Sequence, residues 1–135
     1  MEAIMNELII KGYRKVVSKK NKMAFSRKQG RAYKTKDVKE FEDYVSEIAG
    51  EAIYEWQVEN CIEWNQKKQY HFNLSVIFGD KRKRDIQNCF DCVCDALEGL
   101  VYEDDTQIIS VSGDKAFEKG TWTFEITITE TNKEK

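Results

Sequence analysis

Residues 81–108 combine basic and acidic side chains at a spacing that could support phosphodiester hydrolysis. Positions 81–84 are four consecutive basic residues, Asp85 follows them directly, and Asp104 and Asp105 form a carboxylate pair further on. Carboxylates can hold Mg²⁺, which polarises a phosphate and lowers the pKa of the attacking water. Basic side chains neutralise flanking phosphates and position the strand. Because carboxylates alone repel phosphates, this juxtaposition favours a metal ion between the acidic residues and the substrate.

The charges of the chain are segregated into blocks, although the formal net charge is only −2. Residues 1–36 hold eleven basic and two acidic residues, whereas residues 37–66 hold one and nine. Residues 67–84 hold six basic residues and one acidic residue, whereas residues 85–135 hold four and twelve. A solvated surface usually mixes both signs, so we expect one face for an anionic partner and a separate site built from carboxylates. The alternative is chance clustering in a small, highly charged protein.

Length and composition predict a single domain over residues 1–135. A chain of this length with 41% hydrophobic residues can bury a core without disulfides or a structural metal. Its apolar stretches are shorter than the ~18 residues that a membrane-spanning helix needs. The N-terminal sequence lacks the continuous apolar region and the small-residue cleavage site of a secretory signal. We therefore expect a cytoplasmic protein that does not contact a membrane.

The four cysteines are predicted to be reduced and mostly buried. Cys89, Cys92 and Cys94 lie in one strongly helical stretch, Cys61 stands alone, and His71 is the single histidine. A structural zinc site needs four ligands that converge from two elements, which this spacing does not provide. Disulfides are disfavoured because the chain shows no secretion signal.

Hydrophobic periodicity predicts an α/β (α+β) fold, a small mixed sheet of about four strands covered by two main helices. The expected elements are a strand at 5–10, a long basic loop at 11–36, a helix from Asp37, a strand at 70–78, a helix at 85–98, strands at 106–112 and 121–129, and a polar tail at 131–135. Asp37 is expected to cap the first helix, with Glu40 completing a capping box. Gly113 and Gly120 are expected to bracket the turn between the last two strands.

The first helix carries glutamates at strict four-residue intervals. They are Glu47, Glu51, Glu55, Glu59 and Glu63. Like charges at this spacing repel each other by a few tenths of a kcal/mol per pair. This acidic stripe should therefore be solvated or face a basic partner, and it cannot face a DNA backbone.

The second helix has one apolar and one polar face. The apolar face is expected to comprise Ile86, Cys89, Phe90, Val93, Ala96 and Leu97, and the polar face Gln87, Asp91, Asp95 and Glu98. Gly99 is a suitable helix stop. Asp85 is well placed as a helix N-cap, but the nearby basic tract and carboxylate pair favour a metal ligand, and one residue can do both.

Three motifs in this region resemble the RusA family of Holliday-junction resolvases. They are Arg84-Asp85-Ile86-Gln87-Asn88, Asp95-Ala96-Leu97 and Asp104-Asp105-Thr106-Gln107-Ile108. The resemblance is strongest over residues 80–128 and extends more weakly to the basic stretch 18–33. It implies a small α/β homodimer that cuts four-way DNA junctions symmetrically with Mg²⁺, and no small-molecule cofactor.

Carried over by position, the resemblance implies that Asp85 and Asp105 bind the metal ion. The family has a second aspartate where this chain has Gln87, and a catalytic lysine where it has Asp91. Positions 87 and 91 share a helix face, so the carboxylate could have moved one turn along the helix. Our hypothesis is that Asp85, Asp91 and Asp105 are catalytic and hold Mg²⁺ or Mn²⁺, with Gln87 as a weak or water-mediated contact.

The predicted function is structure-selective cleavage of branched DNA in recombination or repair. The expected DNA-binding residues are Lys19, Lys20, Arg27, Arg31, Lys81, Arg82, Lys83 and Arg84. One alternative is a relative that binds branched DNA but cuts it slowly or not at all. Another is a protein-interaction domain whose basic and acidic blocks pair between subunits.

Overall fold

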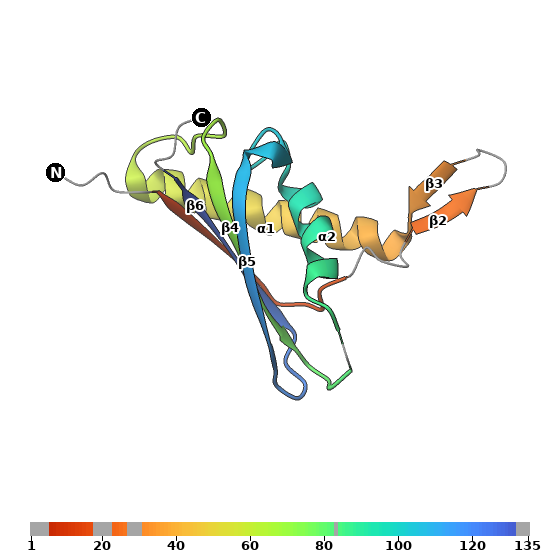
Figure 1. The fold of residues 1–135 in the computed structure, drawn as a ribbon. Coiled ribbons are helices and arrows are strands. Elements are labelled where there is room, and N and C mark those ends of the chain that lie inside the picture. The colour runs from red at the N-terminus through yellow and green to blue at the C-terminus, as the bar shows by residue number, and fades with distance from the viewer. Residues whose placement is uncertain (1–5, 18–22, 27–30, 83, 132–135) are drawn as a thin grey trace.

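A computed structural model describes residues 6–17, 23–26, 31–82 and 84–131, and it contains a mixed sheet with two helices (Figure 1). The elements in chain order are β1 (Glu7–Gly12), β2 (Met23–Ser26), β3 (Arg31–Lys34), α1 (Lys36–Asn60), β4 (Tyr70–Phe78), α2 (Gln87–Leu97), the short 3₁₀ helix η1 (Asp105–Gln107), β5 (Ile108–Phe117) and β6 (Thr123–Glu130). This α+β architecture confirms the fold class expected from the sequence.

The main sheet has the strand order β1-β6-β4-β5. β6 pairs antiparallel with both β1 and β4, whereas β4 and β5 are parallel. Parallel strands need a long crossover, because the chain must return to the edge at which the first strand began. α2 supplies that crossover, and η1 precedes β5 at the edge where β4 also starts.

The sheet buries one face under the helices. Along β4 every second side chain is buried, from Tyr70 to Phe78. Rings of α1 and α2 pack on this face, with Phe41 against Phe124 at 5.6 Å and Phe90 against Phe72 at 5.7 Å between centroids. The opposite face is polar and open, and there His71 Nε2 lies 3.1 Å from Ser112 Oγ.

α1 confirms the expected amphipathic helix. Its buried side chains are Val38, Phe41, Val45, Ala49 and Trp56. The glutamates at 47, 51, 55 and 59 are all exposed, as like-charge repulsion requires. The helix ends at Asn60 with Cys61 in the left-handed conformation (φ 58°), so Glu63 lies beyond the helix.

Two predictions about the N-terminal half are wrong. The segment 11–36 is not one long loop, because β2 and β3 pair antiparallel within it from Met23↔Lys34 to Ser26↔Arg31. The high charge of the segment obscured two four-residue stretches that each contain an aromatic residue, MAFS and RAYK. α1 also begins one residue before Asp37, with Thr35 at the N-cap position.

The prediction that Gly113 and Gly120 bracket a turn is also wrong, because Gly113 does not mark its start. β5 continues through Gly113 to Phe117, and the chain turns only around Gly120, where φ is +77°. A Cβ atom at Gly113 would lie 2.8 Å from the Phe90 ring and 2.9 Å from the Leu74 carbonyl oxygen. Glycine at this position therefore allows the close approach of α2 to the strand.

The cysteines are free thiols, as expected. Cys89 and Cys92 are buried and Cys94 is half-buried, but Cys61 is exposed after the end of α1. Burial raises the pKa of both Cys89 and Cys94 to about 11, so these groups stay protonated at neutral pH. A metal-binding thiolate is thereby disfavoured at both positions.

Within the described residues, neither helix combines the length and the apolar composition that crossing a membrane requires.

Trp64 connects the segment before β4 to the turn that follows α2. Its indole Nε1 donates a buried hydrogen bond to the Val101 carbonyl oxygen at 2.9 Å. Trp64→Phe leaves this acceptor without its partner, so we expect a loss of about 1–3 kcal/mol in the free energy of unfolding, measured by urea denaturation. Trp56→Phe is the matched control, because it trims the neighbouring ring and keeps the bond to Val101. An equal or larger loss in the control would contradict this role of the bond.

Candidate metal centre

The turn after α2 folds the chain back toward the helix. Gly99 adopts φ +83°, and its backbone N–H donates to the Tyr102 carbonyl oxygen at 2.6 Å. The Tyr102 side chain is fully buried, and its hydroxyl donates to the Cys94 carbonyl oxygen at 2.6 Å. These bonds place the residues after Tyr102 beside the C-terminal end of α2.

η1 is held by a capping box. Asp104 Oδ1 accepts a hydrogen bond from the Thr106 backbone N–H at 3.0 Å, and Gln107 Oε1 accepts from the Asp104 backbone N–H at 3.0 Å. Gln107 Nε2 donates to the carbonyl oxygens of Gln66 and Lys68 at 2.7 and 2.8 Å. η1 is therefore fixed to the segment that leads into β4.

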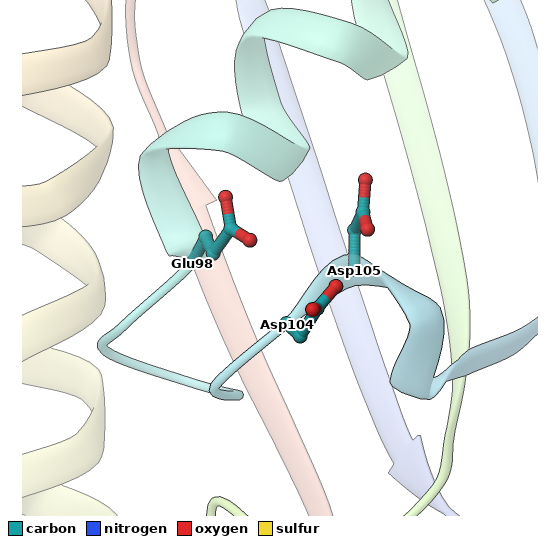
Figure 2. Close-up of side chains that lie close together, drawn as sticks. All are labelled: Glu98, Asp104 and Asp105. Carbon is teal, nitrogen blue, oxygen red and sulfur yellow. The ribbon is translucent and has the colours of Figure 1, made fainter.

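Three carboxylates meet where α2 and η1 approach each other. Each of Glu98, Asp104 and Asp105 offers an oxygen, and these atoms all lie within 4.8 Å of one another. Figure 2 shows Glu98 at the end of α2 and the two aspartates on the returning chain, with Asp105 across from Glu98. All three side chains are exposed. We call these residues the carboxylate cluster.

The two aspartates of the cluster have opposite pKa shifts. The hydrogen bond with Asp104, some desolvation, and the charges of Asp104 and Asp95 raise the pKa of Asp105. The Thr106 backbone N–H and the hydrogen bond with Asp105 lower the pKa of Asp104. Like charges held this close favour one shared proton or a cation, because either relieves the repulsion.

The exposed face of α2 extends the negative field of the cluster. The charges of Asp91, Asp95 and Asp105 all act on the Cys94 thiol and add to the effect of burial on its pKa. Asp91 therefore lies in the same electrostatic environment as Asp105, although it is not a member of the cluster.

The structure places the predicted ligands at different points along α2. Asp105 belongs to the cluster, whereas Asp85 and Asp91 lie outside it. α2 begins at Gln87 with Ile86 as its N-cap residue, so Asp85 is not the N-cap; its Oδ1 accepts from the Gln87 backbone N–H at 3.0 Å. The eleven residues of α2 span about 16 Å, so Asp85 and the cluster lie at opposite ends of the helix.

Among the described residues of the basic tract, Arg84 is fixed by a partner, whereas Lys81 and Arg82 are open to solvent. Arg84 forms a bidentate pair with Asp80, with Nη2 to Oδ2 at 3.1 Å, and this pairing lowers the pKa of Asp80 to about 2. The Arg84 guanidinium also lies 5.1 Å from the centroid of the Trp122 ring. Lys81 and Arg82 are exposed. Lys19, Lys20, Arg27 and Lys83 lie outside the described residues, and only the backbone of Arg31, in β3, is described.

Residue spacing alone does not identify two members of the cluster as ligands. It indicates that Asp104 belongs to an acidic pair and that Glu98 belongs to the polar face of the helix. The usable signal was Gly99, because a helix stop followed by a short return brings the last helical carboxylate close to the next acidic pair.

The protein is a small α+β protein with a carboxylate cluster at one end of its sheet and a basic tract at the other end. The family model of endodeoxyribonuclease RusA matches residues 14–129, so the chain belongs to the RusA endodeoxyribonuclease family. This membership implies a nuclease of the Holliday-junction resolvase type. A search of curated proteins gave no match.

The raised pKa of Asp105 predicts a pH-dependent stability. The folded state binds this proton more tightly than the unfolded chain, so stability falls as the pH rises from 3.8 through the raised pKa. Asp105→Asn removes the repulsion, and we expect a higher Tm than wild type at neutral pH in EDTA. That gain should disappear well below pH 3.8, where the carboxyl is protonated in both the folded and the unfolded state.

Glu118→Gln serves as the control, because it removes an exposed carboxylate at the far end of β5. A neutral-pH Tm for Asp105→Asn equal to or below that of wild type would refute the repulsion argument.

Proposed function

We propose that this protein is a divalent-metal-dependent, structure-selective endonuclease that cuts four-way DNA junctions as a homodimer. The observation that carries the proposal is the carboxylate cluster, three oxygen donors within 4.8 Å in a chain of the RusA family. A two-fold dimer would present two such sites to the two symmetric strands of a junction.

The donor set fits Mg²⁺ or Mn²⁺. Both are hard cations that prefer carboxylate oxygens and keep several waters, which suits an exposed group. Glu98 and Asp105 would hold the ion together with the Asp104 oxygen that does not accept from Thr106. The bound ion would polarise the scissile phosphate and lower the pKa of the attacking water.

Asp91, Gln87 and Asp85 lie progressively further from the cluster along α2. Asp91 would bind the outer waters of the ion, and Gln87 would contact the substrate or those waters. The alternative ligand set joins Asp85 and Asp105, which the family resemblance implies, with Asp91, which our shifted-carboxylate hypothesis adds. That set would require the segment before α2 to move. Glu98→Gln and Asp85→Asn separate the two ligand sets.

The chain's other charged residues position the DNA. Lys81 and Arg82 are exposed and would neutralise backbone phosphates, whereas the exposed acidic face of α1 would repel DNA. Binding should therefore weaken steeply with salt, since each phosphate contact releases counterions.

A cleavage assay on a synthetic mobile four-way junction tests the proposal. We expect paired symmetric nicks with Mg²⁺ and with Mn²⁺, none with EDTA, and little cutting of linear duplex. Asp105→Asn should lose at least about a hundredfold in rate, because the ion would lose one of its three carboxylate ligands. Glu98→Gln should show a comparable loss, and Asp85→Asn a smaller one.

A thermal shift gives a second measurement that does not depend on activity. Mg²⁺ should raise the Tm of the wild-type protein and leave that of Asp105→Asn almost unchanged. If Asp85→Asn abolishes the Mg²⁺-induced rise in Tm and Glu98→Gln does not, the ion binds the alternative ligand set and not the carboxylate cluster. Cutting that persists in EDTA would exclude the proposed metal dependence.

A second candidate function, a branched-DNA binder with a decayed active site, is favoured by one observation. Gln87 and Asp91 stand where the resemblance described above places an aspartate and a lysine of the family. A carboxamide is a weaker ligand than a carboxylate, and an aspartate cannot stabilise a leaving group as a cation does.

The double variant Gln87→Asp/Asp91→Lys distinguishes an adapted site from a decayed one. If Asp91 serves the metal in this chain, the double variant should cut junctions at least about tenfold more slowly than wild type. Junction affinity measured in EDTA should change little, which separates chemistry from binding. A large gain in cleavage rate would instead identify the native arrangement as decayed.

A further inference from the structure

The far end of the sheet carries a cavity of about 460 Å³ that the metal centre does not use. It lies where β4 and β5 end, between Phe78, the turn that follows it, and the last residues of β5 up to Phe117. β5 starts directly after η1, and its ten residues span about 33 Å. The cavity and the carboxylate cluster therefore lie at opposite ends of one strand.

The lining of the cavity is strongly cationic. Lys81, Arg82, Arg84 and Lys115 outnumber a single acidic residue, Asp80. Asp80 is engaged by Arg84, and Lys115 Nζ donates to the Arg84 carbonyl oxygen. Lys81 and Arg82, which also line the cavity, are exposed and can bind an anion.

One wall of the cavity is an open aromatic ring. Phe117 is 45% exposed, and the Lys81 ammonium lies 5.5 Å from its ring centroid. The Lys81 ammonium therefore lies over an accessible face of the Phe117 ring. A planar group could stack on the same face in its place. Phe78, by contrast, is only 4% exposed and forms the floor.

A cation pair beside an open ring matches the chemistry of one nucleotide. We propose that this cavity binds a single unpaired nucleotide, with the base stacked on Phe117 and the adjoining phosphates held by Lys81 and Arg82. Stacking on an aromatic side chain suits every base, because each has a flat π-face. The stacked base would displace Lys81 from the ring and leave its ammonium for the phosphate.

Duplex DNA does not offer this group, because its bases are paired and stacked in the helix. The proposal rests on the proposed function only for the source of the nucleotide. Base pairs at a branch point must break before strands can exchange, and this breakage transiently exposes unpaired bases. Because the cavity lies at the opposite end of β5 from the carboxylate cluster, such a contact would recognise branching at a distance from the cut.

Fluorescence anisotropy in EDTA tests the pocket without any cleavage. Three probes are compared, a labelled oligothymidylate of about ten nucleotides, an abasic oligomer of equal charge and a duplex of equal length. Phe117→Ala should lower the affinity for oligothymidylate about tenfold and leave the abasic oligomer and the duplex within about twofold. Phe117→Trp should retain affinity, and Lys81→Ala/Arg82→Ala should weaken binding of all three probes.

Val111→Ala is the matched control, because Val111 is another half-exposed apolar residue of β5, outside the cavity. Circular dichroism confirms that each variant is folded. An unchanged affinity of Phe117→Ala for oligothymidylate, or an equal loss for the abasic oligomer, would overturn the stacking proposal. If junction cleavage fails but the base-dependent loss at Phe117 persists, the nuclease function fails and the nucleotide pocket stands.

Discussion

The parallel pairing of β4 with β5 is the constraint on which the candidate site depends. It forces the chain to cross over through α2 and to turn back at Gly99 before β5 begins. The buried Tyr102 hydroxyl and the Trp64 indole fix this return by donating to the carbonyl oxygens of Cys94 and Val101. Glu98, the C-cap residue of α2, thereby comes to lie beside the aspartates that precede β5.

Charge is distributed along β5 in a way that suits a protein acting on a polyanion. The acidic end holds carboxylates that repel each other, which is the electrostatic condition for cation binding. The other end holds the exposed cations Lys81 and Arg82, and the Lys81 ammonium lies over the Phe117 ring, an arrangement that suits phosphate and base. The acidic face of α1 is exposed and adds no attraction for DNA.

Positions 87 and 91, where the resemblance implies an aspartate and a lysine in the family, lie at different depths along the exposed face of α2. Gln87 opens α2 and Asp91 lies one turn further along the exposed face, closer to the cluster. Negative charge thus increases along the helix toward Glu98, and Asp91, Asp95 and Asp105 act together on the Cys94 thiol. In this chain the acidic character lies at the C-terminal end of α2, although negative charge there opposes the helix dipole. A bound cation would compensate for that cost.

The sequence by itself determined the mixed sheet, both helices, the exposed glutamates of α1 and the family. The sheet, the helices and the exposed glutamates follow from periodicity and local residue types, and the family follows from the resemblance of three short motifs. The chain carries all of these without any tertiary contact. The tertiary structure alone decided that Gly113 lies inside a strand under Phe90 and that Glu98 joins Asp104 and Asp105. It also paired β2 with β3 inside a segment that reads as a basic loop. The physical reason is that each of these features depends on the close approach of segments distant along the chain, which residue spacing cannot encode.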